Sequence, residues 1–276
     1  MSDELNEIMR ARFGEALDLA EVSDAAQAAV TGIIGRGSCR AFRAEPVSEA
    51  HLRLIAAASL SAPSKSDLQQ RDVILLLDPA RLARVKALLG AQEWIAKAPA
   101  LMLFCANNRR QRQAHAHWGR DFANDHLDAF FNASVDAGIG LATAISAAEA
   151  MGLGCCPIST IRNHLAETRD LLGLPDHVFP VAALAIGWPV YPSPRVTPRL
   201  ALDATVHVDA YRDAPIDAVL TEYEARRGGM TGAPRNPDIY GSAEPYSWSD
   251  DKTRQYGQPE RADFGAFIRQ IGYKLD

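Results

Sequence analysis

Residues 36–40 (RGSCR) place two arginines and a serine close together, a combination suited to binding an anion. Arg36, Ser38 and Arg40 alternate, so in an extended chain their three side chains point to the same side. A guanidinium group carries a fixed fork of hydrogen-bond donors that matches the oxygens of a phosphate. The alternative is a solvated turn before a helix, because short basic motifs also occur by chance. The rest of the chain has to decide between these two interpretations.

A second polar cluster lies in residues 62–70 (APSKSDLQQ). This segment leads directly into the apolar run 73–77, so its hydroxyl and amide groups should lie between a helix and a strand. Such groups can hydrogen-bond the edge of a heteroaromatic ring. Turn formation explains the same residues equally well, since Pro, Ser and Asp are common in turns.

Composition restricts the class of protein. The 276 residues suit one large domain or two small ones. The net charge of −5 argues against a nucleic-acid binder, which usually has a basic face. The acidic N-terminal sequence MSDELNEIMR does not resemble a signal peptide, and the longest apolar run, 179–188, is too short to span a bilayer. The four cysteines fit no zinc spacing, so we interpret them as reduced thiols in a cytoplasmic protein.

Residues 106–120 (NNRRQRQAHAHWGRD) are basic and irregular, and we expect a mobile surface loop there. His115 and His117 stand close enough to suggest a metal site. A metal site also needs further ligands, and the sequence offers neither a second ligand pair nor a nearby acidic triad. We therefore expect no bound metal.

Hydrophobic periodicity and capping residues predict the secondary structure. The long helix is apolar on nearly every face over residues 135–151, which indicates burial in a core or in a subunit interface. Strands scattered among more numerous helices indicate an α/β or α+β protein with one central sheet. Helices are expected at 3–20, 25–34, 49–60, 79–89, 124–152, 162–172, 215–227 and 262–272, and strands at 73–77, 99–105, 155–158 and 178–188.

In combination, these segments resemble the nitroreductase-like FMN-dependent family, and within it the branch of oxygen-insensitive NADPH nitroreductases and flavin reductases. The likeness runs in the same order from about residue 30 to the end of the chain. No single motif decides it, but several in register are difficult to obtain by chance. The matching segments are 36–40, 62–70, 90–92 (GAQ), 152–163 (GLGCCPISTIRN), 172–188, 197–199 (TPR) and 248–250 (WSD).

The resemblance implies a mixed central sheet wrapped by helices, in an intertwined homodimer with two FMN sites at the dimer interface. The long apolar helix would then be buried between the subunits. It also implies three regions: a helical N-terminal extension at 1–29, an FMN-binding core at 30–212, and a C-terminal helical excursion and tail at 213–276. The absence of a GxGxxG motif is compatible with it, since this family binds the nicotinamide transiently over the flavin.

By position, the resemblance implies that Arg36, Ser38 and Arg199 hold the phosphate. It places Arg40 near N1 and O2 of the flavin ring, with Gln92 nearby. The 64–69 loop would face the polar side of the ring, and the backbone of 157–159 would pass N5. No side chain is implied to be catalytic, because flavin N5 carries the chemistry. The implied FMN-binding residues are Arg36, Gly37, Ser38, Arg40, Ser64, Lys65, Ser66, Gln69, Gln92, Pro157, Ile158, Ser159 and Arg199.

The sequence also departs from the family pattern. Thr197 stands where the family often has a lysine, two residues before the phosphate arginine. Asp67 stands where an aromatic residue is common, and Ser159 where a glycine is usual. The segment before residue 24 is longer than the branch usually shows. We still expect the chain to bind FMN. The departures leave open which substrate and which nucleotide it prefers.

The function implied is a ping-pong reaction in which NADPH or NADH reduces FMN. A small-molecule oxidant, such as a nitroaromatic compound, a quinone or a free flavin, then takes the electrons. Two alternatives stay open: a reductive dehalogenase or specialised dehydrogenase that uses the same flavin, and a non-catalytic flavin carrier. Halide release would identify the dehalogenase, and a flavin inert to nicotinamide would identify the carrier.

Overall fold

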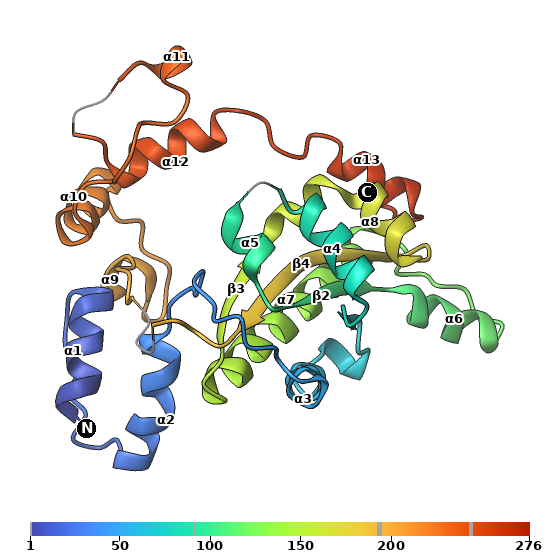
Figure 1. The fold of residues 1–276 in the computed structure, drawn as a ribbon, viewed down its shortest axis with the longest axis horizontal. Helices are drawn as coiled ribbons and strands as arrows, with labels where there is room; N and C mark the ends of the chain where they lie inside the picture. Colours follow the sequence, from blue (N-terminus) through green and yellow to red (C-terminus); the bar gives the residue numbers. More distant parts are fainter. Residues whose placement is uncertain (1, 91, 192–194, 243–244) are drawn as a thin grey trace. The chain divides into compact units, whose positions relative to one another are not determined.

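The computed structural model describes residues 2–90, 92–191, 195–242 and 245–276. The chain forms two compact units (Figure 1). The first unit comprises Met1–Gly37 and Pro194–Glu260, and the second comprises Ser38–Ser193 and Arg261–Asp276. The boundary after Gly37 therefore falls within the arginine-rich motif at 36–40.

The second unit is built on a four-stranded sheet in the order β1-β2-β4-β3. The strands are β1 (Arg71–Leu75), β2 (Ala100–Asn107), β3 (Gly154–Ile158) and β4 (Val178–Gly187). The α+β class is confirmed. The resemblance implies a mixed sheet. In the structure, β1 with β2, β2 with β4 and β3 with β4 all pair antiparallel, so the described strands form an antiparallel sheet.

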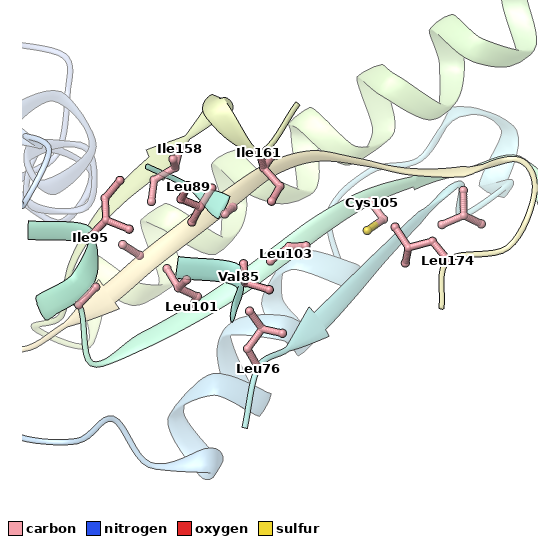
Figure 2. Close-up of a cluster of buried hydrophobic side chains, with 14 residues drawn as sticks. Leu76, Val85, Leu89, Ile95, Leu101, Leu103, Cys105, Ile158, Ile161 and Leu174 are labelled. Atoms are coloured by element: carbon pink, nitrogen blue, oxygen red, sulfur yellow. The ribbon is translucent and has the colours of Figure 1, made fainter. Parts of the chain in front are cut away.

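One face of the sheet packs on α4 (Pro79–Leu88), α5 (Glu93–Lys97), the 3₁₀ turn η2 (Ser159–Asn163) and α8 (Leu165–Leu172). Figure 2 shows this cluster of buried side chains. Leu101, Leu103 and Cys105 of β2 lie in it, as expected for alternate residues of a strand. Val85 and Ile95 cover them from the two helices.

The opposite face packs on α3 (Glu49–Leu60) and α7 (Leu127–Ala150). Met102 and Phe104 of β2 point to this side, where they meet Ala144 and Ala148 of α7. The C-terminal helix α13 (Phe264–Gln270) adds an aromatic cluster that includes Phe179. The sheet therefore has helices on both faces. The candidate site residues of the second unit lie in segments that connect these strands and helices.

Most expected elements of the second unit are confirmed within a few residues, but the surface loop expected at 106–120 is wrong. Residues 109–117 form α6 (Arg109–His117). The Asn107 side-chain oxygen accepts hydrogen bonds from the backbone N–H of Arg109 and Arg110 and so starts the helix. Arg112 then pairs with Asp125 at 2.5 Å. The basic composition gave no apolar periodicity from which to predict this helix, which the contacts of Asn107 and Arg112 stabilise.

The first unit contains α1 (Ser2–Phe13), α2 (Asp24–Gly35) and α10 (Ile216–Arg227), with the shorter helices α9 (Leu202–Thr205), α11 (Pro237–Tyr240) and α12 (Trp248–Tyr256). The helix expected at 3–20 ends early, at Phe13. Gly14 has a φ of +85°, and a Cβ there would lie 2.8 Å from Cδ of Arg226. Gly14 thus ends the first helix in a left-handed conformation that glycine adopts readily, with the Arg226 side chain packed beside it.

Two general properties follow from the described residues. No helix among them has the length and apolar character needed to cross a bilayer. All four cysteines are free thiols, and three of them are buried.

Candidate functional site

In the first unit, Arg12 connects the two segments that carry the expected phosphate ligands. Its guanidinium donates to Ile34 O at 2.7 and 3.0 Å and also to Arg36 O. The same group donates to Thr197 O at 3.0 Å. In return, Arg199 N donates to Arg12 O at 2.6 Å. The end of α2 and the 197–199 segment are therefore joined through one side chain of α1.

Arg226 of α10 reinforces this connection. Its guanidinium donates to Arg199 O at 2.8 Å and to Arg12 O at 3.3 Å. Glu222, one helical turn earlier, pairs with Arg226 and holds it in place. The Arg199 guanidinium itself is exposed and, within the described part of the chain, donates to Thr197 Oγ1 at 3.0 Å and Pro198 O at 3.2 Å. The backbone at Arg199 is thus fixed while its side chain stays at the surface.

Two other guanidinium groups act on the charge of Arg12 in this part of the first unit. Burial lowers the pKa of Arg12, and the nearby charges of Arg199 and Arg36 lower it further. An anion with two negative charges bound near these guanidinium groups would offset the effect of Arg36 and Arg199 on Arg12. This donor set suits a phosphate monoester.

In the second unit, residues 38–43 run beside the sheet. Cys39 N donates to Cys155 O at 3.0 Å, and Arg43 N donates to Trp188 O at 2.8 Å. Gly154 permits this approach, because a Cβ there would lie 2.6 Å from the sulfur of Cys39. The segment that contains Ser38 and Arg40 is therefore attached at the ends of β3 and β4, and both side chains are exposed.

Arg40 and Gln92 both contact the side chain of Trp94. The Arg40 guanidinium carbon lies 5.7 Å from the centroid of the Trp94 ring, a cation–π distance. The Trp94 indole N–H donates to Gln92 Oε1 at 2.6 Å. The family resemblance places Gln92 near Arg40 but assigns no role to Trp94. An aromatic residue two positions after a glutamine in a polar turn was the available signal.

The turn after β3 lies next to the same region. Thr160 Oγ1 donates to Leu89 O at 3.3 Å, which ties the start of η2 to the residue before Gly90. Pro157 and Ser159 are exposed there, whereas Ile158 is buried in the core. Ala91, part of the matched segment 90–92, lies outside the described residues.

The 64–69 loop has an unusual backbone. Ser66, Asp67 and Gln69 have φ angles of +50°, +54° and +50°, in the left-handed region that residues other than glycine seldom adopt. Such conformations persist where the surroundings determine them, and they concentrate at functional sites. Lys65 and Ser66, both exposed, form the outer turn of the loop with the 3₁₀ turn η1 (Lys65–Asp67).

A buried ion pair holds this loop, and sequence reasoning missed it. Asp136 of α7 and Arg71 of β1 lie 3.5 Å apart with side chains only 2% and 3% exposed. Asp136 Oδ2 accepts from the Ser64 hydroxyl at 2.8 Å and from Gln70 N at 2.7 Å. Ser64 Oγ accepts in turn from Gln69 N at 2.7 Å. The Ser64 hydroxyl therefore points inward and supports the loop.

Arg71 completes the support from the other side. Its guanidinium donates to Pro63 O at 2.9 Å, to Leu60 O at 3.2 Å and to Ala62 O. The residues leading into the loop are thus fixed as firmly as those inside it. A charged residue at the start of a strand that ends in three apolar residues, 73–75, was the sequence signal for this role.

Comparison with known proteins identifies the family of the chain. The family model described as "Nitroreductase family" matches residues 33–188, which is more than half of the chain. The chain belongs to the nitroreductase family. The model of the family's C-terminal domain matches residues 197–276. Residues 1–32, which include α1 and Arg12, precede both matches.

Individual members of the nitroreductase family agree with this assignment. The FMN reductase [NAD(P)H] of Bacillus subtilis is 39% identical over 176 residues, which are 63% of this chain and 70% of the relative. The oxygen-insensitive NADPH nitroreductase of Salmonella typhimurium is 34% identical over 205 residues, 72% of this chain and 83% of the relative. The solved structure of the hypothetical oxidoreductase YcnD from Bacillus subtilis is similar with a TM-score of 0.79 and 30% identity, covering 90% of this chain and 98% of that one.

Proposed function

We propose that this nitroreductase-family chain is an FMN-dependent oxidoreductase that uses NAD(P)H to reduce a small acceptor such as a nitroaromatic compound, a quinone or a free flavin. Family membership and the activities named for the relatives support the reaction class. The observation that carries the cofactor assignment is that the Arg12 side chain and main chain join the segments of Arg36 and Arg199 by hydrogen bonds.

The residues fit the two chemically different ends of FMN. Arg36 and Arg199 would bind the phosphate, which needs charged, forked donors. Ser38 would add a hydroxyl donor to the same phosphate. Arg40, supported by Trp94, would lie at the N1–O2 edge of the ring with Gln92 beside it. The remaining polar contacts to the ring would come from the 64–69 loop and from residues 157–159.

When bound, FMN supplies a ring that takes up hydride from NAD(P)H and releases two electrons to an acceptor, in a ping-pong sequence. The chain's own contribution is to place positive charge where negative charge develops on reduction, and Arg40 is the residue we assign to that role. The fixed 64–69 loop would orient the ring without having to reorganise. We assign no side chain to proton transfer.

The test of this proposal is uptake of the cofactor. The purified full-length chain, supplied with excess FMN and freed of unbound flavin, should retain stoichiometric FMN, measured from the visible absorbance of the flavin. A protein that retains no flavin under these conditions would overturn the proposed function.

Arg40→Ala should make the bound flavin harder to reduce. Loss of the guanidinium removes charge that favours the reduced, anionic ring, so the midpoint potential should fall by tens of millivolts, where about 30 mV equals about 1.4 kcal/mol for two electrons. Potentiometric titration measures this, and FMN affinity should weaken less than when a phosphate ligand is lost. Arg43→Ala is the matched control. Arg43 lies in the same segment, and its guanidinium carbon is 5.7 Å from the centroid of a different tryptophan ring, that of Trp188. An unmoved potential combined with abolished FMN binding would make Arg40 a phosphate ligand.

We also propose that two chains associate through α7. The helix turns Ala137, Ala144 and Ala148 to the core, but its other side is apolar as well. An exposed apolar stripe at four-residue spacing would be an association surface. It consists of Leu127, Phe131, Val135 and Ile139.

Phe131→Glu should therefore shift the protein from dimer to monomer. The Phe131 side chain is 59% exposed at the middle of the stripe, and a buried unpaired carboxylate there would oppose association. Light scattering should give twice the chain mass of 29.9 kDa for the parent and the single mass for the variant. Leu77→Glu, at an exposed leucine outside α7, should stay dimeric. A parent protein that is active as a stable monomer would contradict the proposal.

A further inference from the structure

Arg12 is a buried cation in a part of the chain that neither family model covers. It lies near the end of α1, and only 4% of its surface is exposed. Among the described residues, each hydrogen bond of its guanidinium ends on a main-chain carbonyl. Those carbonyls belong to the two segments that carry Arg36 and Arg199.

We propose that Arg12 is a positioning residue for the flavin phosphate, which fixes the segments of Arg36 and Arg199 relative to each other. This inference rests on the proposed function, because it takes these two arginines as the phosphate ligands. It adds a role for the N-terminal segment of this particular chain.

The geometry requires an arginine. The guanidinium fork spans Ile34 O on one side and Thr197 O on the other, using three different nitrogen atoms. A lysine ammonium is a single point of attachment and does not provide this planar fork. The backbone bond from Arg199 N to Arg12 O adds a second link to the same segment. Arg12 thus holds the 197–199 segment through both its side chain and its main chain.

The electrostatics of the Arg12 environment favour an anion bound nearby. Burying a guanidinium without a carboxylate is unfavourable, even when carbonyls satisfy its hydrogen bonds. The pKa of Arg12 is lowered by burial and then by the charges of Arg199 and Arg36, so the cluster is destabilised by its own charge. A phosphate bound to Arg36 and Arg199 would offset that repulsion.

A purely structural role for Arg12 makes a different prediction. A cation at the C-terminal end of α2 stabilises that helix through its last carbonyls, with or without a bound phosphate. Loss of this cap would weaken the binding of every flavin to a similar degree. Loss of a phosphate-positioning residue would weaken only flavins that carry the phosphate.

The experiment compares FMN with riboflavin, which has the same ring and no phosphate. Dissociation constants for both are measured by fluorescence titration of the full-length, flavin-free chain. The variants are Arg12→Gln, Arg12→Lys and, as matched control, Arg10→Gln on the exposed side of the same helix. Arg12→Lys serves also if Arg12→Gln fails to fold, as judged by circular dichroism.

The parent should bind FMN more tightly than riboflavin. In Arg12→Gln this preference should fall by about tenfold, less than on loss of a phosphate ligand itself, because Arg12 acts only through the segments of Arg36 and Arg199. Riboflavin affinity should be unchanged, Arg12→Lys should fall in between, and Arg10→Gln should match the parent. An unchanged preference, or equal weakening of both ligands, would overturn the inference while leaving the proposed function intact. A parent that binds neither flavin would overturn both.

Discussion

We expect Asp136→Ala to lose about 3–5 kcal/mol of unfolding free energy, the effect of removing one partner of a buried ion pair. The substitution leaves the Arg71 guanidinium charged and 3% exposed, with no carboxylate beside it. It also leaves the Ser64 hydroxyl and the Gln70 N–H without their acceptor. Urea unfolding followed by circular dichroism measures the change.

Asp128→Ala provides the matched control. Asp128 lies on the same helix and pairs with Lys65 of the same loop at 3.3 Å, but both side chains are about half exposed. Exposed pairs contribute about 0–1 kcal/mol, so this variant should remain close to the parent. If both variants lost equally little, the 64–69 loop would not depend on the buried pair, and its strained backbone would need another explanation.

Arg199→Ala should weaken FMN binding by roughly 2–3 kcal/mol, the range for a lost charge-assisted hydrogen bond to phosphate. That corresponds to roughly a 30- to 140-fold higher dissociation constant. The fold itself should be little affected, because Arg12 and Arg226 bind the main chain of Arg199 and the lost guanidinium is exposed. Titration of the flavin-free chain with FMN gives the affinity.

Arg195→Ala is the control for general charge, because Arg195 is also exposed and lies four residues earlier in the same segment. It should bind FMN like the parent. A loss below about 0.5 kcal/mol in Arg199→Ala, the range of ordinary surface substitutions, would place the phosphate elsewhere.

Local signals predicted the secondary structure well where they were strong. Ser23 and Ser48 precede α2 and α3 in the sequence, and each accepts the backbone hydrogen bond of a helix N-cap. The continuous apolar run of β4 was equally clear. The end of α1 was not predictable from periodicity, because the apolar pattern continues past Phe13 while Gly14, with a φ of +85°, ends the helix.

The candidate site was predictable only in part. The family resemblance predicted Arg40 and Gln92 as neighbouring site residues, and in the structure both contact Trp94. Trp94, Arg12 and Asp136 act through contacts between distant segments, and an isolated tryptophan, arginine or aspartate carries no local sign of such a partner. Residues that hold a site are therefore harder to find in one sequence than residues that line it.

The measurement that tests the central claim most directly is an anaerobic titration of the FMN-loaded chain with NADPH and, separately, NADH. The account predicts that at least one nucleotide bleaches the visible absorbance of the bound flavin. Adding a quinone or a nitroaromatic compound under argon should then restore it, as expected for electron transfer through FMN in two separate steps. Bound flavin whose absorbance responds to neither nucleotide would contradict the account and would indicate a flavin carrier.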